Sequence, residues 1–355
     1  MSRDTPVRQV ARHNIAAVGR NAAQSGRWER SRPDGGVHGA RRAGLTRTLS
    51  DVPEGDTIYR AAAALRTALV GEKLVEFEAP RLVGRMPTPG RTIEDVRSHG
   101  KNLEIVFDDD LVLHSHMKMT GSWHLYRPGE RWRRHPRQMR ALLGTPSWTA
   151  VCFNAPVVET YRTPDRRRHP GMGNLGPDLC RADADLGACA QMLATYPERD
   201  TALAEVMLDQ RVMCGVGNVY RSEVLWATRL SPWSPIGEIT SDEAELVTET
   251  AARMLRSNLH HAHRITAADV PGGLAVYGRA AQPCFRCRTP IRSTRSGQFA
   301  RVVYWCPDCQ CRHEPAPAPV QREMDPHPAA ARYLAEIRQR RAASRREHPA
   351  GRLPA

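Results

Sequence analysis

Cysteines near the end of the chain restrict its possible folds more than any other feature of the sequence. The segments PCFRC and WCPDC hold two C-x2-C pairs separated by eighteen residues: Cys284, Cys287, Cys306 and Cys309. Each pair can supply two thiolates to one tetrahedral zinc ion, and four thiolates leave no open position for a substrate. The spacing therefore predicts a structural zinc site. Incidental or redox-active pairs are the alternative reading, and Cys311 and His313 are alternative ligands nearby.

The residues between the two cysteine pairs predict a β-hairpin. The segment TPIRSTRSGQFARVVYW has a Ser-Gly turn, and Arg292, Arg295 and Arg301 make it basic. A hairpin braced by zinc, with arginines at its end, is suited to gripping a phosphate backbone. This feature indicates a nucleic-acid binder but gives no information about a reaction.

The net charge favours the same kind of partner. The 355 residues carry a formal charge of +14, and 41% of them are hydrophobic, which is enough for real cores. Basic side chains release counterions when they meet phosphates, so a polyanionic partner is favoured over a merely solvated basic surface. Of 52 basic residues, only Lys73, Lys101 and Lys118 are lysine. In so arginine-rich a chain, a remaining lysine is a candidate for a role that needs an amine.

The sequence gives no indication of a membrane or secreted protein. It has no run of roughly 18 apolar residues, and the first 50 residues lack the apolar core of a signal peptide. We therefore expect a cytoplasmic protein whose nine cysteines are mostly reduced or bound to metal.

Hydrophobic periodicity divides the chain into segments. A helix is predicted from Thr57, capped by Asp56 or Thr57 and ended by Gly71. Alternating runs then predict strands, with a turn at 108–110: KLVEFEA, NLEIVF, LVLHSHM, SWHLYR and TAVCFN. Three further segments have helical spacing: LGACAQMLATYP, TALAEVMLDQRV and SDEAELVTETAARMLRSNLHHA.

These segments predict an α+β fold of two domains and a finger. The expected ranges are a β-sandwich or barrel-like domain over 52–180, a helical domain over 181–275 and the zinc hairpin over 276–313. The Arg-rich segment 1–51 and the Pro/Ala-rich, then Arg-rich tail 314–355 are expected to be disordered.

A glycine loop precedes one of the helical stretches. Gly215, Gly217 and Asn218 belong to the sequence GVGN, whose glycines let the backbone approach a ligand closely. The following helix can present free N–H groups to a phosphate. Alone, the motif fits a plain helix–helix turn equally well.

Taken together, the motifs resemble the formamidopyrimidine-DNA glycosylase/endonuclease VIII family of base-excision repair enzymes. The matching segments occur in family order: PEGDT, GKNL, HMKMTGSW, DQRVMCGVGNVYRSEVLWATRLSP, VYGR and the four cysteines. The PEGDT start and the short segment RITAADVPGGLA are closer to the endonuclease VIII branch, which favours oxidised pyrimidines as substrates. The resemblance implies an N-terminal β-sandwich with flanking helices, a helix–two-turn–helix unit and a C-terminal zinc finger. It also implies damaged DNA as the partner, bound between the two halves with the base flipped out, and thus an association with the bacterial nucleoid. One cleft and one zinc finger per chain are compatible with a monomer.

The resemblance also implies residue roles. Pro53 corresponds to the N-terminal proline whose amine attacks the deoxyribose C1′ and forms an iminium, and Glu54 corresponds to the proton donor. Lys101 corresponds to the lysine that transfers protons in β-elimination and contacts phosphate. The remaining matches are Arg301, the hairpin arginine of δ-elimination, Asn218, the phosphate-binding asparagine, and Met119, a wedge into the gap left by the flipped base. For Met119, packing in the hydrophobic core is an alternative role that the sequence supports equally well.

Pro53 departs from the family pattern because it is internal. An acylated proline nitrogen has no lone pair to give, so this chain as written cannot form the Schiff base. We expect Val52 to be a GTG start codon translated conceptually as valine; cleavage after Val52 is a second reading. The third reading is a permanent extension, which makes the protein a non-catalytic binder of damaged DNA. The wedge loop also departs, because DRRRHPG at Asp165 has no Phe, so no second wedge is assigned.

Overall fold

The computed structural model of the protein describes residues 52–261, 263–297 and 300–313. All of them fall within one compact unit of the chain, Arg47–Ala355. The expectations of disorder for 1–51 and 314–355 lie outside the described residues.

The first element, α1 (Gly55–Leu69), forms because its apolar side chains share one helical face. Ile58, Ala62, Leu65 and Leu69 are buried on that face. The helix ends at Leu69, two residues before Gly71, whose positive φ of 85° is a conformation that glycine adopts without strain. The predicted helix is confirmed, but the predicted cap is wrong: the N-cap residue is Glu54, and no side chain caps the helix.

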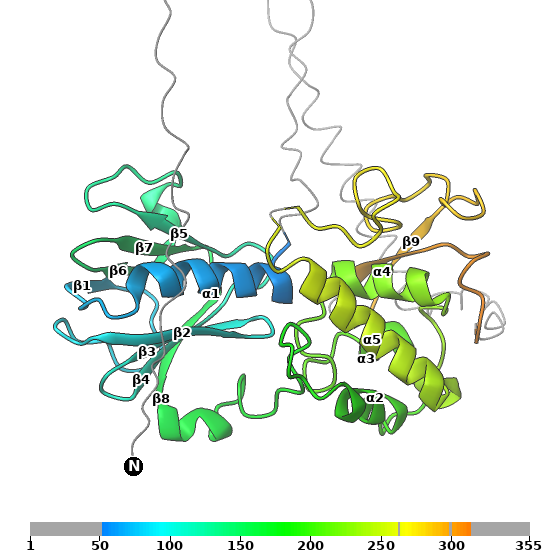
Figure 1. The fold of residues 1–355 in the computed structure, drawn as a ribbon, viewed down its shortest axis with the longest axis horizontal. Coiled ribbons are helices and arrows are strands. Elements are labelled where there is room, and N and C mark those ends of the chain that lie inside the picture. The colour runs from blue at the N-terminus through cyan, green and yellow to red at the C-terminus, as the bar shows by residue number, and fades with distance from the viewer. Residues whose placement is uncertain (1–51, 262, 298–299, 314–355) are drawn as a thin grey trace, which may run out of the picture. The chain divides into compact units, whose positions relative to one another are not determined.

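Eight strands form two antiparallel four-stranded sheets, and both pack around α1 (Figure 1). The first sheet has the order β1 (Glu76–Glu78), β6 (Met139–Gly144), β7 (Thr149–Phe153) and β5 (Ser122–Tyr126). The second has the order β2 (Ile93–His99), β3 (Asn102–Phe107), β4 (Leu111–His116) and β8 (Val157–Arg162). Short 3-10 turns precede β6 and follow β8: η2 (Pro136–Gln138) and η3 (Thr163–Arg168).

A single core joins the two sheets and α1, which makes this part of the chain a β-sandwich. Leu103 and Leu113 of the second sheet lie in the same buried cluster as Leu143 and Ala150 of the first, together with Leu65 of α1. The predicted strands around β3, β4, β5 and β7 are confirmed. The run KLVEFEA forms only the three-residue β1, and the sequence reading missed β2, β6 and β8.

Helices form the next part of the chain around a separate core. They are α2 (Leu186–Ala194), α3 (Leu203–Val206), α4 (Asn218–Thr228) and α5 (Ser241–Ser257), with η4 (Ile236–Glu238) before α5. A capping box between Thr240 and Glu243 fixes the start of α5. The predicted long helix over 201–212 is wrong. Only α3 forms, because the Asp209 carboxylate accepts the N–H of Arg211 in a local turn that competes with the helix.

The last described element is the predicted hairpin, which is confirmed. Strands β9 (Arg292–Ser296) and β10 (Arg301–Trp305) pair antiparallel. Ile291, Cys284 and Cys306 pack against Trp226 of α4, so the hairpin rests on the helical part. None of the helices in the described part of the chain combines the length and apolar character that a membrane span needs.

Candidate active site and metal centre

The carboxylate of Glu54 lies against the start of α4. It accepts N–H groups from Gly217 at 3.1 Å, Val219 at 2.7 Å and Tyr220 at 3.3 Å. These are the free donors of a helix N-terminus, where a negative charge is stabilised. The Glu54 side chain therefore caps α4 rather than its own helix. It is buried, and burial raises its pKa, against the opposing charges of Arg264 and Lys101.

Glycines make this contact possible. A Cβ on Gly217 would lie 2.3 Å from the Glu54 Cδ, and one on Gly55 would lie 2.7 Å from the Cys180 Sγ. The Gly55 N–H donates to the Gly215 carbonyl at 3.0 Å. The GVGN loop thus receives the first residues of α1 through direct backbone contact, a close approach that glycine permits. The predicted approach to a ligand stays a prediction.

Lys101 occupies the turn between β2 and β3 and is buried. Burial lowers its pKa to about 8, opposed by the charge of Glu54 and assisted by that of Arg301. Glu54 and Lys101 are therefore electrostatic neighbours. An amine with this pKa is available in both protonation states near neutral pH.

Pro53 is buried immediately before α1. The carbonyl oxygen of Val52, which shares an amide with the Pro53 nitrogen, accepts a hydrogen bond from Arg264 at 3.3 Å. In this form of the chain the proline nitrogen is acylated and has no free lone pair.

Two buried residues of this site were missed by sequence reasoning. Asp56 and Arg264 form an ion pair of 2.6 Å, and both side chains are almost fully buried, at 0% and 1% exposed. Both stand in segments that carried the family resemblance, PEGDT and RITAADVPGGLA, but nothing local links them, because they are 208 positions apart. Their opposite charges were the signal in the sequence that could have suggested a pair.

Asn218 and Arg301 lie where the helices meet the hairpin. The Asn218 amide donates to the Val302 carbonyl at 2.8 Å, and its oxygen accepts from Arg221. Arg221 is buried, and burial lowers its pKa to about 10, assisted by the charge of Arg301. Arg221, Arg301 and Glu205 line a cavity of about 410 Å³. Arg221 was also missed by sequence reasoning.

Met119 lies in the loop between β4 and β5 and is 48% exposed. This exposure excludes the core-packing alternative. The neighbouring motif residue His116, at the end of β4, has its pKa lowered to about 3 by burial and by the charges of Lys118 and Lys101. His116 is thus a neutral imidazole beside the buried lysine. The DRRRHPG stretch forms η3 and the turn after it, where Arg166 pairs with Glu104 of β3.

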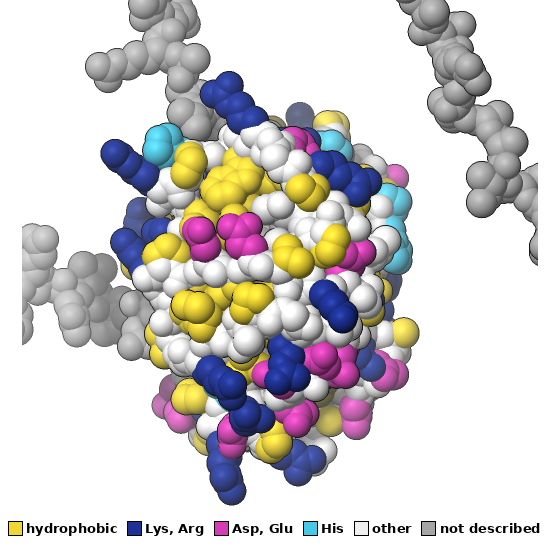
Figure 2. Space-filling model, turned by 90° about the vertical axis from the view of Figure 1, so that its left-hand side faces the viewer, with side chains coloured by type: hydrophobic (Ala, Val, Ile, Leu, Met, Phe, Trp, Pro, Cys, Tyr) yellow, Lys and Arg dark blue, Asp and Glu magenta, His cyan; other side chains and the backbone are white. Residues whose placement is uncertain are grey.

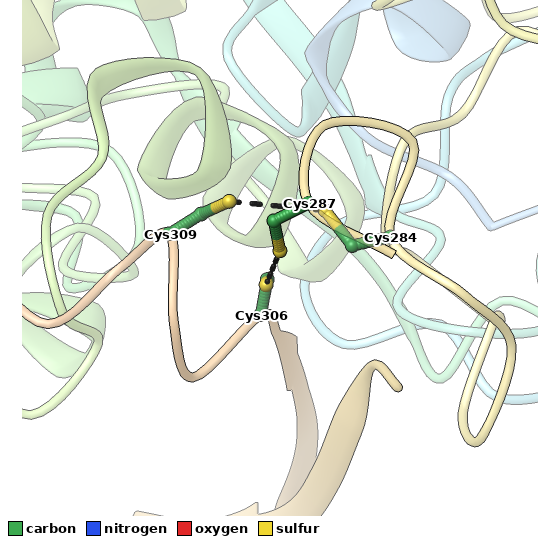
Figure 3. Close-up of side chains that lie close together, drawn as sticks. All are labelled: Cys284, Cys287, Cys306 and Cys309. Carbon is green, nitrogen blue, oxygen red and sulfur yellow. Dashed lines mark hydrogen bonds between the residues drawn. The ribbon is translucent and has the colours of Figure 1, made fainter. Parts of the chain in front are cut away.

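The four predicted cysteines form one cluster. Their sulfur atoms lie within 4.8 Å of one another and come from the two ends of the hairpin. Figure 3 shows the Cys287–Cys306 pair at 3.4 Å and the Cys284–Cys309 pair at 3.9 Å. The Trp226 indole N–H points to the Cys284 sulfur at 3.5 Å, an outer-shell contact of the kind that orients a metal ligand.

The two alternative ligands do not join this cluster. The His313 Nε2 lies 3.0 Å from the Glu243 carboxylate, and the exposed Cys311 thiol donates to the Asp308 carbonyl. The other predicted non-ligand cysteines are buried as expected: Cys152, Cys180, Cys189 and Cys214. The cluster is a closed set of four soft donors that fits a tetrahedral metal ion.

This fold is the fold of DNA glycosylases of the formamidopyrimidine class. The chain aligns with Lactococcus lactis formamidopyrimidine-DNA glycosylase bound non-covalently to DNA containing an AP site, with a TM-score of 0.59 and 21% identity, over 72% of this chain and 99% of that one. It also aligns with MutM in complex with DNA containing carbocyclic 8-oxo-G, with a TM-score of 0.61 and 21% identity, over 73% and 99% of the two chains.

Sequence comparison assigns the family. The models of the formamidopyrimidine-DNA glycosylase N-terminal domain and H2TH domain match residues 52–157 and 175–269. A Streptomyces coelicolor protein named "Probable endonuclease 8 2" is 40% identical over 273 residues, which cover 76% of this chain and 96% of the relative. The DNA-(apurinic or apyrimidinic site) lyase Nei2 of Mycolicibacterium smegmatis is 37% identical over 264 residues, which cover 73% and 99%. The chain belongs to the formamidopyrimidine-DNA glycosylase/endonuclease 8 family.

Proposed function

We propose that this protein is a bifunctional DNA glycosylase and AP lyase of base-excision repair, which removes oxidised bases, with pyrimidines favoured. The observation that carries the proposal is the buried carboxylate of Glu54, held on the N-terminus of α4 directly beside Pro53 and within electrostatic reach of Lys101. An acid, an amine and a proline at one buried point are the groups that this chemistry needs.

The reaction begins at the proline nitrogen of a form whose chain starts at Pro53. The nitrogen lone pair attacks C1′ of the deoxyribose, and the bond from C1′ to the base breaks with its electron pair leaving on the base. The proton that the nitrogen loses goes to the departing base. The nitrogen lone pair then forms the C1′=N bond while the C1′–O4′ bond breaks, and Glu54, whose pKa is raised by burial, gives its proton to O4′. The resulting iminium has no N–H to lose, so it stays cationic and draws electrons for strand cleavage.

Lys101 transfers protons in the β-elimination that follows, since its pKa of about 8 allows both giving and accepting at neutral pH. Arg301 holds phosphate and assists δ-elimination, and Asn218 contacts phosphate at the start of α4. The exposed Met119 enters the gap left by the flipped base.

The four cysteines hold a structural zinc ion, which braces the hairpin against DNA. In this proposal residues 52–180 are the catalytic domain, residues 181–275 the helix–two-turn–helix domain and residues 276–313 the zinc finger. The protein acts on damaged DNA as a monomer. The site needs no second copy, because one chain supplies all of its residues.

The proposal requires a free Pro53 nitrogen. The match to the N-terminal domain model begins at residue 52, which supports a working form that starts at Pro53 after loss of the preceding residue. Translation from a GTG codon at Val52, or cleavage after Val52, would each yield that form. A permanently acylated Pro53 favours the second candidate function, a damage-binding protein without catalysis.

Borohydride trapping on DNA that contains an abasic site tests the proposal. The chain from Met1 is compared with the form that begins at Pro53, because borohydride reduces the iminium to a stable protein–DNA bond. We expect only the shorter form to be trapped. If both forms bind this DNA and neither is trapped, the second candidate is correct. Trapping of the full-length chain would identify another amine as the nucleophile, and Lys101 would be tested first.

A further inference from the structure

Arg264 grips the backbone and side chains on both sides of Pro53. Its Nη2 and Nε donate to the two oxygens of Asp56 at 2.6 Å and 3.1 Å. The same Nη2 lies 3.2 Å from the Thr57 hydroxyl and 3.3 Å from the Val52 carbonyl oxygen. One guanidinium from the segment after α5 therefore contacts the residue before Pro53 and the first turn of the helix after it.

A role in stability alone does not account for this arrangement. Removing two charges from water costs several kcal/mol per ion, and apolar residues of similar volume often replace a buried ion pair without loss of stability. A bidentate guanidinium, in contrast, fixes the orientation of a carboxylate as well as its distance. The pair therefore fits a function in which the direction of the first turn of α1 matters.

The position of the guanidinium relative to the proline nitrogen follows from the amide geometry. The oxygen and the nitrogen of one amide lie about 2.3 Å apart, because the C=O and C–N bonds are about 1.23 Å and 1.33 Å long. Since Nη2 lies 3.3 Å from the Val52 oxygen, it lies within about 6 Å of the Pro53 nitrogen. In a chain that begins at Pro53, the bonds to Asp56 and Thr57 remain and hold the charge at this position.

We propose that Arg264 is a positioning residue for the reaction, which sets the place of the N-terminal amine of Pro53 relative to Glu54 through its grip on Asp56 and Thr57. This inference rests on the proposed function. Arg264 acts through the first turn of α1 and touches no reacting atom.

The charged groups around the amine predict a pH signature. Glu54 and Asp56 follow Pro53 within three residues, and Lys101 couples to Glu54 from the turn between β2 and β3. The ring of Tyr220 on α4 lies 4.9 Å from the Arg264 guanidinium. A guanidinium within about 6 Å favours the neutral, nucleophilic form of an amine, whereas an uncovered Asp56 carboxylate favours the charged form. On the acid limb of the pH profile, the trapping rate rises as the amine loses its proton. Loss of Arg264 therefore moves this limb to higher pH.

The test uses the form that begins at Pro53, with the variants Arg264→Gln and Arg264→Lys. At saturating abasic DNA, we expect Arg264→Gln to be trapped at least 10-fold more slowly than the parent, with an acid limb at higher pH. We expect its affinity for this DNA to change less than 3-fold. Arg264→Lys keeps the charge but loses the bidentate grip, so its rate should lie between the two. The double variant Arg264→Gln/Asp56→Asn should be no slower than Arg264→Gln alone, because both changes remove one interaction.

Arg60 supplies the matched control. It pairs with the same Asp56 carboxylate at 3.2 Å and lies 3.5 Å from the Thr57 hydroxyl, but it makes a single bond to Asp56 in place of the bidentate grip. Its side chain is also 23% exposed, against 1% for Arg264. Arg60→Gln should be trapped at close to the parent rate. Trapping of Arg264→Gln at the parent rate and with the parent pH profile would overturn the inference and leave the proposed function intact, whereas a parent form that is never trapped would remove the function itself. If Arg264→Gln does not fold, a folded Arg264→Lys with unchanged rate and pH profile would overturn the inference equally.

Discussion

The burial of the Lys101 amine lowers the stability of the folded protein, because the charged form of the amine loses its contact with water. The unfolded chain keeps this lysine protonated up to about its ordinary pKa of 10.5, whereas the folded chain does so only up to about 8. Folding is therefore penalised in full below pH 8, and the penalty disappears as the pH rises from 8 to 10.5. A residue kept at such a cost is typical of a functional site.

The variant Lys101→Gln should consequently be more stable than the parent at pH 7, by about 1–3 kcal/mol, while its strand cleavage is lost. Unfolding in denaturant measured from pH 7 to pH 10.5 checks this, and the stability difference should shrink across the upper part of that range. Lys73→Gln, at an exposed position, changes the net charge equally and should show no such trend. A difference that stays constant with pH would contradict the assignment.

At the residue scale, the motifs of the sequence indicated residues that the structure brings together, whereas a residue whose partner is distant in the chain gave no such signal. Glu54 and Lys101 were predicted from the motifs PEGDT and GKNL, and the structure brings their charges together. Arg264 could not be predicted, because its role depends on a carboxylate that only the tertiary fold brings to it. The Asn218 amide was predicted for phosphate, whereas in the structure it also ties α4 to β10.

At the scale of elements, α4 is the helix on which the site is built. Its N-terminus holds Glu54, and further along Glu223 accepts the backbone N–H groups of Ala275, Val276 and Tyr277. Its last turn carries Trp226, whose N–H meets Cys284. The helix α4 thus holds three features in place through hydrogen bonds: the Glu54 carboxylate, the VYGR segment and the cysteine cluster.

The contact at the start of α4 can be disturbed by one methyl group. Gly217→Ala would place a Cβ 2.3 Å from the Glu54 Cδ, so the carboxylate must leave the helix N-terminus. We expect at least a 100-fold loss of base release, in the range of a removed general acid. Single-turnover assays on the form that begins at Pro53 measure this.

The control for that experiment is Gly187→Ala in α2. A Cβ there would meet only the Asp185 carboxylate, at an ordinary 3.5 Å. This change should leave activity unchanged and raise stability by less than about 1 kcal/mol, since Gly187 lies in the first turn of α2, where the preference for alanine is weaker than in a helix interior. Normal base release by Gly217→Ala would show that the Glu54 position is not critical.

Elements with a clear period were predicted, and those without one were missed. Strands β3 and β4 stand out in the sequence because each begins or ends in a cluster of apolar residues, and the structure buries nearly every residue of both. Strand β2, IEDVRSH, has only two buried positions and an irregularity between Ile93 and Asp95, so no alternation is readable. The segment 201–212 has helical spacing but folds as turns after α3, because side-chain hydrogen bonds of Asp209 and Gln210 compete with the helix.

At the scale of the whole molecule, the basic excess is not spread over every face. Figure 2 shows the sandwich end of the molecule, where Lys and Arg side chains are interspersed with Asp, Glu and apolar ones. Such a face is a poor phosphate surface. The hairpin differs, because Arg292 and Arg295 are exposed on β9 and belong to the element that the cysteines brace.

Loss of the proposed zinc ion should therefore weaken DNA binding and leave the sandwich folded. Cys306→Ser removes a buried ligand, and we expect it to bind no zinc and to bind abasic DNA at least 10-fold more weakly, since a structural zinc site supplies the folding energy of its hairpin. Metal analysis and a binding titration measure both effects. Cys311→Ser should keep one zinc per chain and normal affinity, and loss of zinc from that variant would mean that the ligand set is wrong.

The ion pair between Asp56 and Arg264 closes a loop of 208 positions, and Glu54 meets α4 across 163. Contacts of such length form late in folding, after local helices and hairpins. A chain still emerging from the ribosome lacks the N–H donors for Glu54 until α4 has been made, and lacks the guanidinium for Asp56 until residue 264 has been made. Incomplete chains and C-terminally truncated fragments would then be unable to nick DNA, so the strand-cutting activity appears only in a molecule that is already finished.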